Sequence, residues 1–196
     1  YMIFYYNGAG AASELALIVN MFFIFGVLAS LGAVLTLPGI AGIVLTIGMA
    51  VDANVLIYER IREELNLGKG LRLAIEDGYK HAYSSIIDAN VTTFLTGVIL
   101  YAFGTGPIRG FATTLIIGIL TSLFCAIFIT RLVFEARLGA KKSVAFFTGV
   151  TRNAFTKFSI DFLGKRKIAY TISCLIILTG IISLSTRGLN YGVDFV

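Results

Sequence analysis

The amino-acid sequence predicts an all-α polytopic membrane protein with five complete spans and the end of a sixth. Hydrophobic residues make up 57% of the chain and charged residues only 14%, whereas a soluble globular chain carries about 25% charged residues. The mean hydropathy is +0.88. Five apolar runs approach the length of about 20 residues that a helix needs to cross a bilayer. These observations exclude a soluble globular domain.

The apolar runs and the turn signals between them set the predicted elements. Residues 1–6 contain three tyrosines, which are enriched at the membrane interface, so this segment is predicted to end a span. The Gly-rich residues 7–12 are predicted to form a tight turn, and Leu37-Pro38-Gly39 to break the first complete span. The five complete spans are predicted at residues 13–37, 40–58, 82–103, 110–134 and 168–186.

The connections between the spans differ in character. The polar stretch 59–81 is predicted to form short helical pieces, and residues 104–107 a hairpin. Residues 135–167 are a basic connection whose apolar residues recur near helical spacing, as is typical of an amphipathic helix in the membrane interface. A docking surface for a partner is the alternative. The residues concerned are Gly68, Gly70 and Gly78 in the polar stretch, and Thr151, Phe155, Phe158 and Phe162 in the basic connection.

The placement of Lys and Arg predicts the orientation. Five basic residues lie in residues 59–81 and nine between Arg131 and Lys167, whereas only Arg109 and Arg187 lie on the opposite side by span counting. The positive-inside rule therefore makes loops 59–81 and 135–167 cytoplasmic, and residues 187–196 are predicted to begin an extracytoplasmic segment. The basic residues show no interleaved stacking aromatics, so no nucleic-acid partner is expected.

A carboxylate lies well inside the second span. Residues 40–58 are apolar apart from Thr46, Asp52 and Asn54. An Asp at the centre of a spanning helix costs about 2.5–3.5 kcal/mol on insertion scales, and such residues mark ion paths, substrate paths or proton relays. We interpret Asp52 as a proton-transport residue. The alternative is a carboxylate that only bonds a neighbouring helix.

The same motif recurs in the third span, as Asp52-Ala53-Asn54-Val55 and Asp88-Ala89-Asn90-Val91. Each Asp lies six residues from the cytoplasmic end of its run, or about 9 Å along a helix, so the two carboxylates are predicted to face each other at one depth. Burial and a nearby like charge both favour a protonated carboxylate, which a proton relay requires. Asp88 is therefore predicted to be a second proton-transport residue, with a structural role as the alternative. The candidate supporting polar residues are Asn54, Asn90, Thr92 and Thr93, for which ordinary interhelical hydrogen bonding is the simpler explanation.

The cysteines and the single His bear on whether the chain binds a metal or a cofactor. Two separate cysteines, Cys125 and Cys174, and one His build no metal framework, so we expect no metal, no cofactor and no enzyme. The expected coupling ion is H⁺, with Na⁺ as the alternative, because carboxylate, Asn and Thr oxygens bind either.

Glycines in two spans are predicted to let helices approach closely. They are Gly39, Gly42, Gly48, Gly106, Gly110 and Gly118.

Several segments resemble one family. Residues 35–65 resemble the SecD subunit of the bacterial protein-export complex, and residues 88–93 and 104–111 match later spans of the same family. Residues 161–195 resemble the opening of SecF. The chain is thus similar to a SecD–SecF fusion, with SecD-like helices over 1–134 and the first SecF-like helix at 168–186, and we expect it to be a piece of a longer polypeptide.

This resemblance implies a fold similar to that of the RND transporters. It also implies a function in which the proton motive force promotes polypeptide export across the bacterial cytoplasmic (inner) membrane. The implied partners are the Sec translocon channel, the emerging secretory polypeptide and membrane lipid. Asp52 matches the SecD transmembrane aspartate implicated in proton transport, and Asp88 falls in a second characteristic segment. Alternatives are an RND-type exporter of a lipid or small molecule, and a non-transporting scaffold of the Sec complex.

Overall fold

The computed structural model describes residues 1–140, 144–148 and 163–188. The chain divides into two compact units, Tyr1–Arg152 and Asn153–Val196. The described residues of both units contain helices and connections and no strand. The predicted amphipathic helix around Phe155 and most of the predicted extracytoplasmic tail lie outside the described residues.

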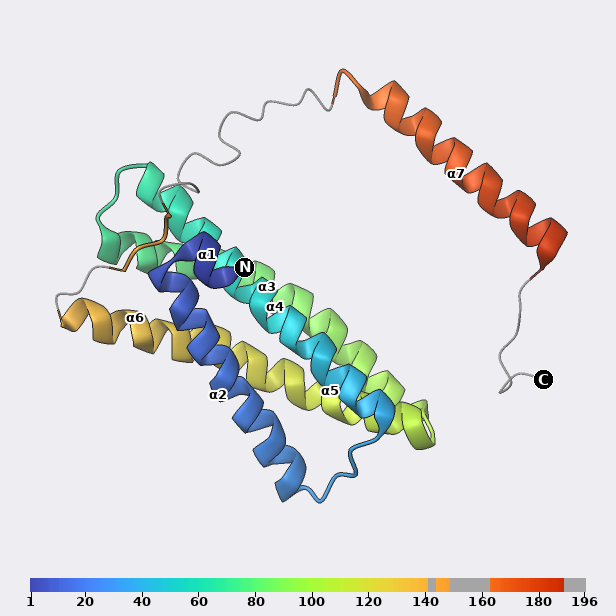
Figure 1. Cartoon of the computed structure of the whole chain (residues 1–196), viewed down its shortest axis with the longest axis horizontal. Helices are drawn as coiled ribbons and strands as arrows, with labels where there is room; N and C mark the ends of the chain where they lie inside the picture. Colours follow the sequence, from blue (N-terminus) through green and yellow to red (C-terminus); the bar gives the residue numbers. More distant parts are fainter. Residues whose placement is uncertain (141–143, 149–162, 189–196) are drawn as a thin grey trace. The chain divides into compact units, whose positions relative to one another are not determined.

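The first unit is a helix bundle built around α3 (Figure 1). Helix α3 packs against both α4 and α5, and α2 packs against α5. Helix α5, the π-helical turn η1 and α6 follow one another without a break. The elements are α1 (Met2–Tyr6), α2 (Gly8–Ser30), α3 (Leu37–Asn66), α4 (Leu71–Phe103), α5 (Gly106–Phe124), η1 (Cys125–Ile129) and α6 (Thr130–Gly139).

Five helices are long and apolar enough to cross a membrane, which confirms the predicted number of spans among the described residues. Four belong to the first unit: Gly8–Ser30, Leu37–Asn66, Leu71–Phe103 and Gly106–Gly139. The fifth lies within α7 (Arg166–Arg187) of the second unit. The apolar side chains described on α7 are exposed within that unit, as expected of a helix whose surroundings are lipid or other spans.

Two predicted boundaries near the N-terminus are wrong. Residues 7–12 are not a turn, because α2 already begins at Gly8 and only Asn7, with φ of 52°, interrupts the helical chain. A side chain at Gly10 would overlap the backbone of Met2, so this glycine serves close packing of α1 on α2. The first complete span also ends early, at Ser30. Pro38 lies in the first turn of α3, where its missing N–H costs nothing.

The polar stretch 59–81 is simpler than predicted. Helix α3 continues to Asn66, and α4 resumes at Leu71. Gly68, with φ of 86°, occupies the turn between them, and Gly70 caps α4. Gly78, however, lies inside α4, where any side chain would overlap Ile61 of α3. The prediction that Gly78 divides the chain is therefore wrong, since this glycine permits helix contact.

Small residues bring α3 and α5 together. A side chain at Gly118 of α5 would overlap Thr46 of α3, and one at Gly42 of α3 would overlap Thr114 of α5. Gly39 and Gly110 lie in the same contact around Thr36, which confirms close approach at four of the six predicted glycines. Positions 48 and 106 have open space around them among the described residues, so the prediction is wrong there.

Candidate functional site

Asp52 lies in a groove between α3 and α4. The groove has a volume of about 170 Å³ and a mixed lining, in which apolar side chains lie beside Ser85, Asn90 and Thr93. It is open, and the Asp52 side chain is exposed within the described chain. The α3 wall comprises Met49, Asp52, Ala53 and Leu56, and the α4 wall comprises Ser85, Ile86, Ala89, Asn90 and Thr93.

Asp88 does not line this groove, so the prediction of facing carboxylates is wrong. Asp88 is exposed on α4, where it accepts a long 3.5 Å hydrogen bond from the Ser84 hydroxyl. The reason is the rotation of α4 about its axis. Ala89 and Asn90 of the second motif line the groove with Asp52, whereas Asp88 lies on another face of α4.

The four predicted supporting residues divide in the same way. Asn90 and Thr93 line the groove with Asp52. The Asn90 amide nitrogen donates to the Ile86 carbonyl at 2.8 Å, a bond that leaves the amide oxygen for other donors. Asn54 is buried on another face of α3, and Thr92 is exposed and donates to the carbonyl of Asp88 at 3.1 Å.

Asp52 is a carboxylate without an ion-pair partner in the described part of the chain. No group of three or more His, Cys, Asp or Glu side chains is arranged to hold a metal ion among those residues. A single carboxylate with an amide and a hydroxyl nearby has the chemistry to take up a proton or to bind a small monovalent cation.

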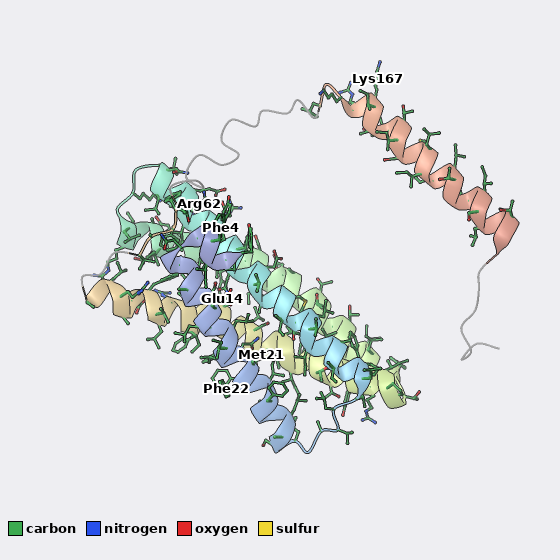
Figure 2. The ribbon with its side chains drawn as sticks, in the orientation of Figure 1. Phe4, Glu14, Met21, Phe22, Arg62 and Lys167 are labelled. Carbon is green, nitrogen blue, oxygen red and sulfur yellow. The ribbon has the colours of Figure 1, made fainter. Side chains whose placement is uncertain are left out.

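A buried cation near the C-terminal end of α3 was missed by sequence reasoning. Arg62 is only 6% exposed, although it falls in a stretch predicted to be a loop. Its guanidinium lies 5.0 Å from the ring centroid of Tyr5 and 4.9 Å from that of Phe147, and pairs with Glu59 at 2.8 Å. Figure 2 shows Arg62 at the same end of the bundle as Phe4 of α1. The aromatic partners are distant in sequence, so no local pattern indicated this site.

Lys69 ties the polar ends of α3 and α4 together, outside the apolar runs 40–58 and 82–103. Its ammonium lies 2.6 Å from carboxylate oxygens of both Glu64 and Asp77, and His81 contacts Glu64 at 3.0 Å. The hydrogen bonds from Lys69 lower the pKa of both carboxyls, and the two carboxylates raise the pKa of Lys69. The His81 side chain is exposed.

A second polar residue was also missed. Asn20 is fully buried in the middle of α2, where it is the lone amide of an apolar helix. That pattern could have been read from the sequence, since a polar side chain within a span usually has a partner or a function.

Comparison with known proteins decides the family. Residues 1–137, well over half of the chain, match the model of a family described as protein export membrane protein SecD/SecF, C-terminal. The chain belongs to the SecD/SecF family. It is 64% identical over 135 residues to the protein translocase subunit SecD of Rhodothermus marinus, covering 69% of this chain and 22% of that protein. It is 52% identical over 143 residues to SecD of Haemophilus influenzae, covering 72% and 23%.

Solved SecDF structures share the fold. The crystal structure of SecDF from Thermus thermophilus, described as a translocon-associated membrane protein, matches with a TM-score of 0.87 and 37% identity. SecDF in a super-membrane-facing form matches with a TM-score of 0.85 and 36% identity. Each match covers 98% of this chain and 26% of the SecDF chain. The chain therefore has the fold of the SecDF membrane region and spans about a quarter of the length of its relatives.

Proposed function

We propose that the protein is an accessory subunit of the Sec protein translocase and uses the proton motive force to promote polypeptide export. Membership of the SecD/SecF family supports the translocase role, since the relatives described above are named protein translocase subunits. The observation that carries the energetic part is the position of Asp52. It is a carboxylate without an ion-pair partner among the described residues, set in a groove between α3 and α4, midway along a helix that is long and apolar enough to cross a membrane.

In this proposal Asp52 is the principal protonatable residue. Proton uptake neutralises the carboxylate and removes the charge from the groove, and proton release restores it. One elementary charge that crosses 100 mV releases about 2.3 kcal/mol, which is enough to bias two conformations of helices α3 and α4. Asn90 and Thr93 have polar atoms on the facing wall and are proposed to orient the carboxylate or a water molecule beside it.

The remaining assignments follow from the same proposal. The partners are the Sec translocon channel, the emerging secretory polypeptide and the lipid of the bacterial cytoplasmic membrane. Loops 59–81 and 135–167 face the cytoplasm. No covalent chemistry is assigned, and the coupling ion is H⁺. The alternative coupling ion is Na⁺. If Na⁺ were the coupling ion, export would follow a sodium gradient at constant pH.

Export into membrane vesicles tests this function. Inverted vesicles that contain or lack the protein would receive a reporter preprotein, with and without an imposed proton gradient. We expect the gradient to increase export only in vesicles that contain the protein, and site-specific cross-links to form with the translocating chain. Equal export in both vesicle types, together with proton-driven efflux of a lipid or small molecule, would overturn the proposal in favour of an exporter.

A further inference from the structure

The middle of α2 holds a polar group with nothing to bond among the described residues. Asn20 is 0% exposed, and neither its amide nitrogen nor its amide oxygen has a hydrogen-bond partner within that part of the chain. Native proteins pair most of their buried polar groups with protein or with ordered water. An amide that is sealed from solvent and wholly unpaired therefore points to a small polar ligand beside it.

A second buried amide in the same region has a spare acceptor. Asn54 of α3 is 3% exposed. Its nitrogen donates to the Ala50 carbonyl at 3.1 Å, whereas its side-chain oxygen lacks a partner among the described residues. The pair thus offers one donor group and two acceptors to a ligand.

The register of three helices places these asparagines at one level. Thr46 of α3 contacts Gly118 of α5, and these two helices run in the same direction. Eight residues after Thr46 comes Asn54, and eight residues after Gly118 comes Ala126 of η1, so Asn54 and Ala126 lie at a similar level. Phe23 of α2 packs on Phe124 with ring centroids 5.9 Å apart. Asn20 precedes Phe23 by three residues, about 4.5 Å along a helix, in the direction of η1. The neighbouring Met21 marks this level of α2 in Figure 2.

The π-helical turn η1 lies at the same level. It contacts both α2 and α3, and the Thr130 N–H bonds the Cys125 carbonyl across five residues in place of four. Such π turns interrupt the regular hydrogen-bond ladder and are frequent at functional sites. The Ala126 carbonyl already accepts from the Thr130 hydroxyl at 2.5 Å. Among the buried side chains described at this level, the atoms that lack a partner are those of the two asparagines.

We infer that the junction of α2, α3 and η1 is an internal water-binding site held by Asn20 and Asn54. Buried water typically makes about three hydrogen bonds to otherwise unsatisfied polar groups, and the two side chains leave three such atoms among the described residues. The site holds neutral water because no ionisable side chain is among these atoms. It is separate from the Asp52 groove, whose lining includes neither asparagine, and it does not rest on the proposed function.

X-ray radiolytic footprinting of the protein in lipid nanodiscs tests this site. Radicals formed from bound water oxidise the side chains beside it, and H₂¹⁸O in the buffer marks the oxygen as coming from exchangeable water. Cys125 is 2% exposed and lies at this level, so it is the natural reporter. Phe134, buried in an apolar cluster, is the dry control. We expect ¹⁸O on Cys125 well above the level on Phe134.

Variants separate internal water from other sources of label. The double substitution Asn20→Leu with Asn54→Leu should reduce Cys125 labelling to the level of Phe134, and Asn20→Ser, which keeps a polar group, should retain it. An unlabelled Cys125 in the wild-type protein would overturn the inference even if a variant fails to fold. Label on Cys125 that persists in a folded double variant would also overturn the inference. Label that disappears when choline replaces Na⁺ in the buffer would overturn it in favour of a bound cation.

Discussion

Asp52 and Asn90 lie on opposite walls of one groove, the first on α3 and the second on α4. We therefore predict that Asn90→Ala weakens the response of export to the proton gradient. An interhelical hydrogen bond in a membrane contributes about 0.6 kcal/mol on average, which corresponds to a roughly threefold effect. Thr92→Ala is the matched control, since Thr92 lies outside the groove. Equal effects of the two substitutions in a vesicle export assay would contradict this role for Asn90.

The contact between Thr46 and Gly118 predicts a large cost for a small change. Gly118→Ala should destabilise the bundle by about 1–3 kcal/mol, because the added methyl group overlaps the Thr46 side chain. Gly26→Ala on α2 is the control, because there the new methyl group meets open space among the described residues. Thermal unfolding in detergent would compare the two, and a Gly118→Ala protein as stable as Gly26→Ala would refute the close contact.

A buried chain of hydroxyls links α4 to the helix after η1. The Tyr79 hydroxyl lies 2.5 Å from the Thr130 hydroxyl, which donates to the Ala126 carbonyl. Tyr79→Phe removes one hydrogen bond and should lower the free energy of unfolding by about 1 kcal/mol. Tyr83→Phe, at an exposed position, should have no measurable effect. A loss that is equal for both variants would show that the hydroxyl chain does not stabilise the bundle.

The ion pairs of Lys69 with Glu64 and Asp77 predict an acid-sensitive link between α3 and α4. The carboxyl pKa values of Glu64 and Asp77 are lowered from 4.5 and 3.8, so their contribution to stability is complete above about pH 4.5 and is lost as the pH falls through the lowered values. The pKa of Lys69 is raised from 10.5, so its contribution is complete below pH 10.5 and is lost at higher pH.

Unfolding of wild type and Lys69→Met between pH 3 and pH 7 would measure this effect. We expect the difference in melting temperature between the two proteins to shrink as the pH falls below about 4.5. Glu63→Gln, which removes an exposed ion pair with Arg60, is the control and should change the melting temperature little at any pH. A difference that stays constant with pH would contradict the proposed link.

The long apolar runs were enough to predict the five spans, because a bilayer demands about 20 apolar residues whatever the surrounding packing. The glycine-based boundaries were less reliable. Gly78 was predicted to break the chain, yet it lies inside α4 against Ile61, because a sequence does not show whether a glycine serves a turn or a close contact. Only the structure separates these two uses.

The site was predicted in part for a similar reason. A lone carboxylate in a span indicates a functional position without any knowledge of neighbours, and Asp52 does lie in a groove. The pairing with Asp88 required the relative rotation of α3 and α4, which a repeated motif does not encode. Arg62 was missed because Tyr5 and Phe147, which cover it, are brought to it only by folding.

The most direct measurement compares Asp52→Asn with Asp88→Asn, two isosteric changes that remove one carboxylate each. Secretion of a reporter would be followed under an imposed proton gradient, at matched levels of folded protein. The proposed function predicts that Asp52→Asn abolishes the response to the gradient while Asp88→Asn, outside the groove, largely retains it. Export by Asp52→Asn that responds to the gradient as wild type does would show that Asp52 is only a packing residue.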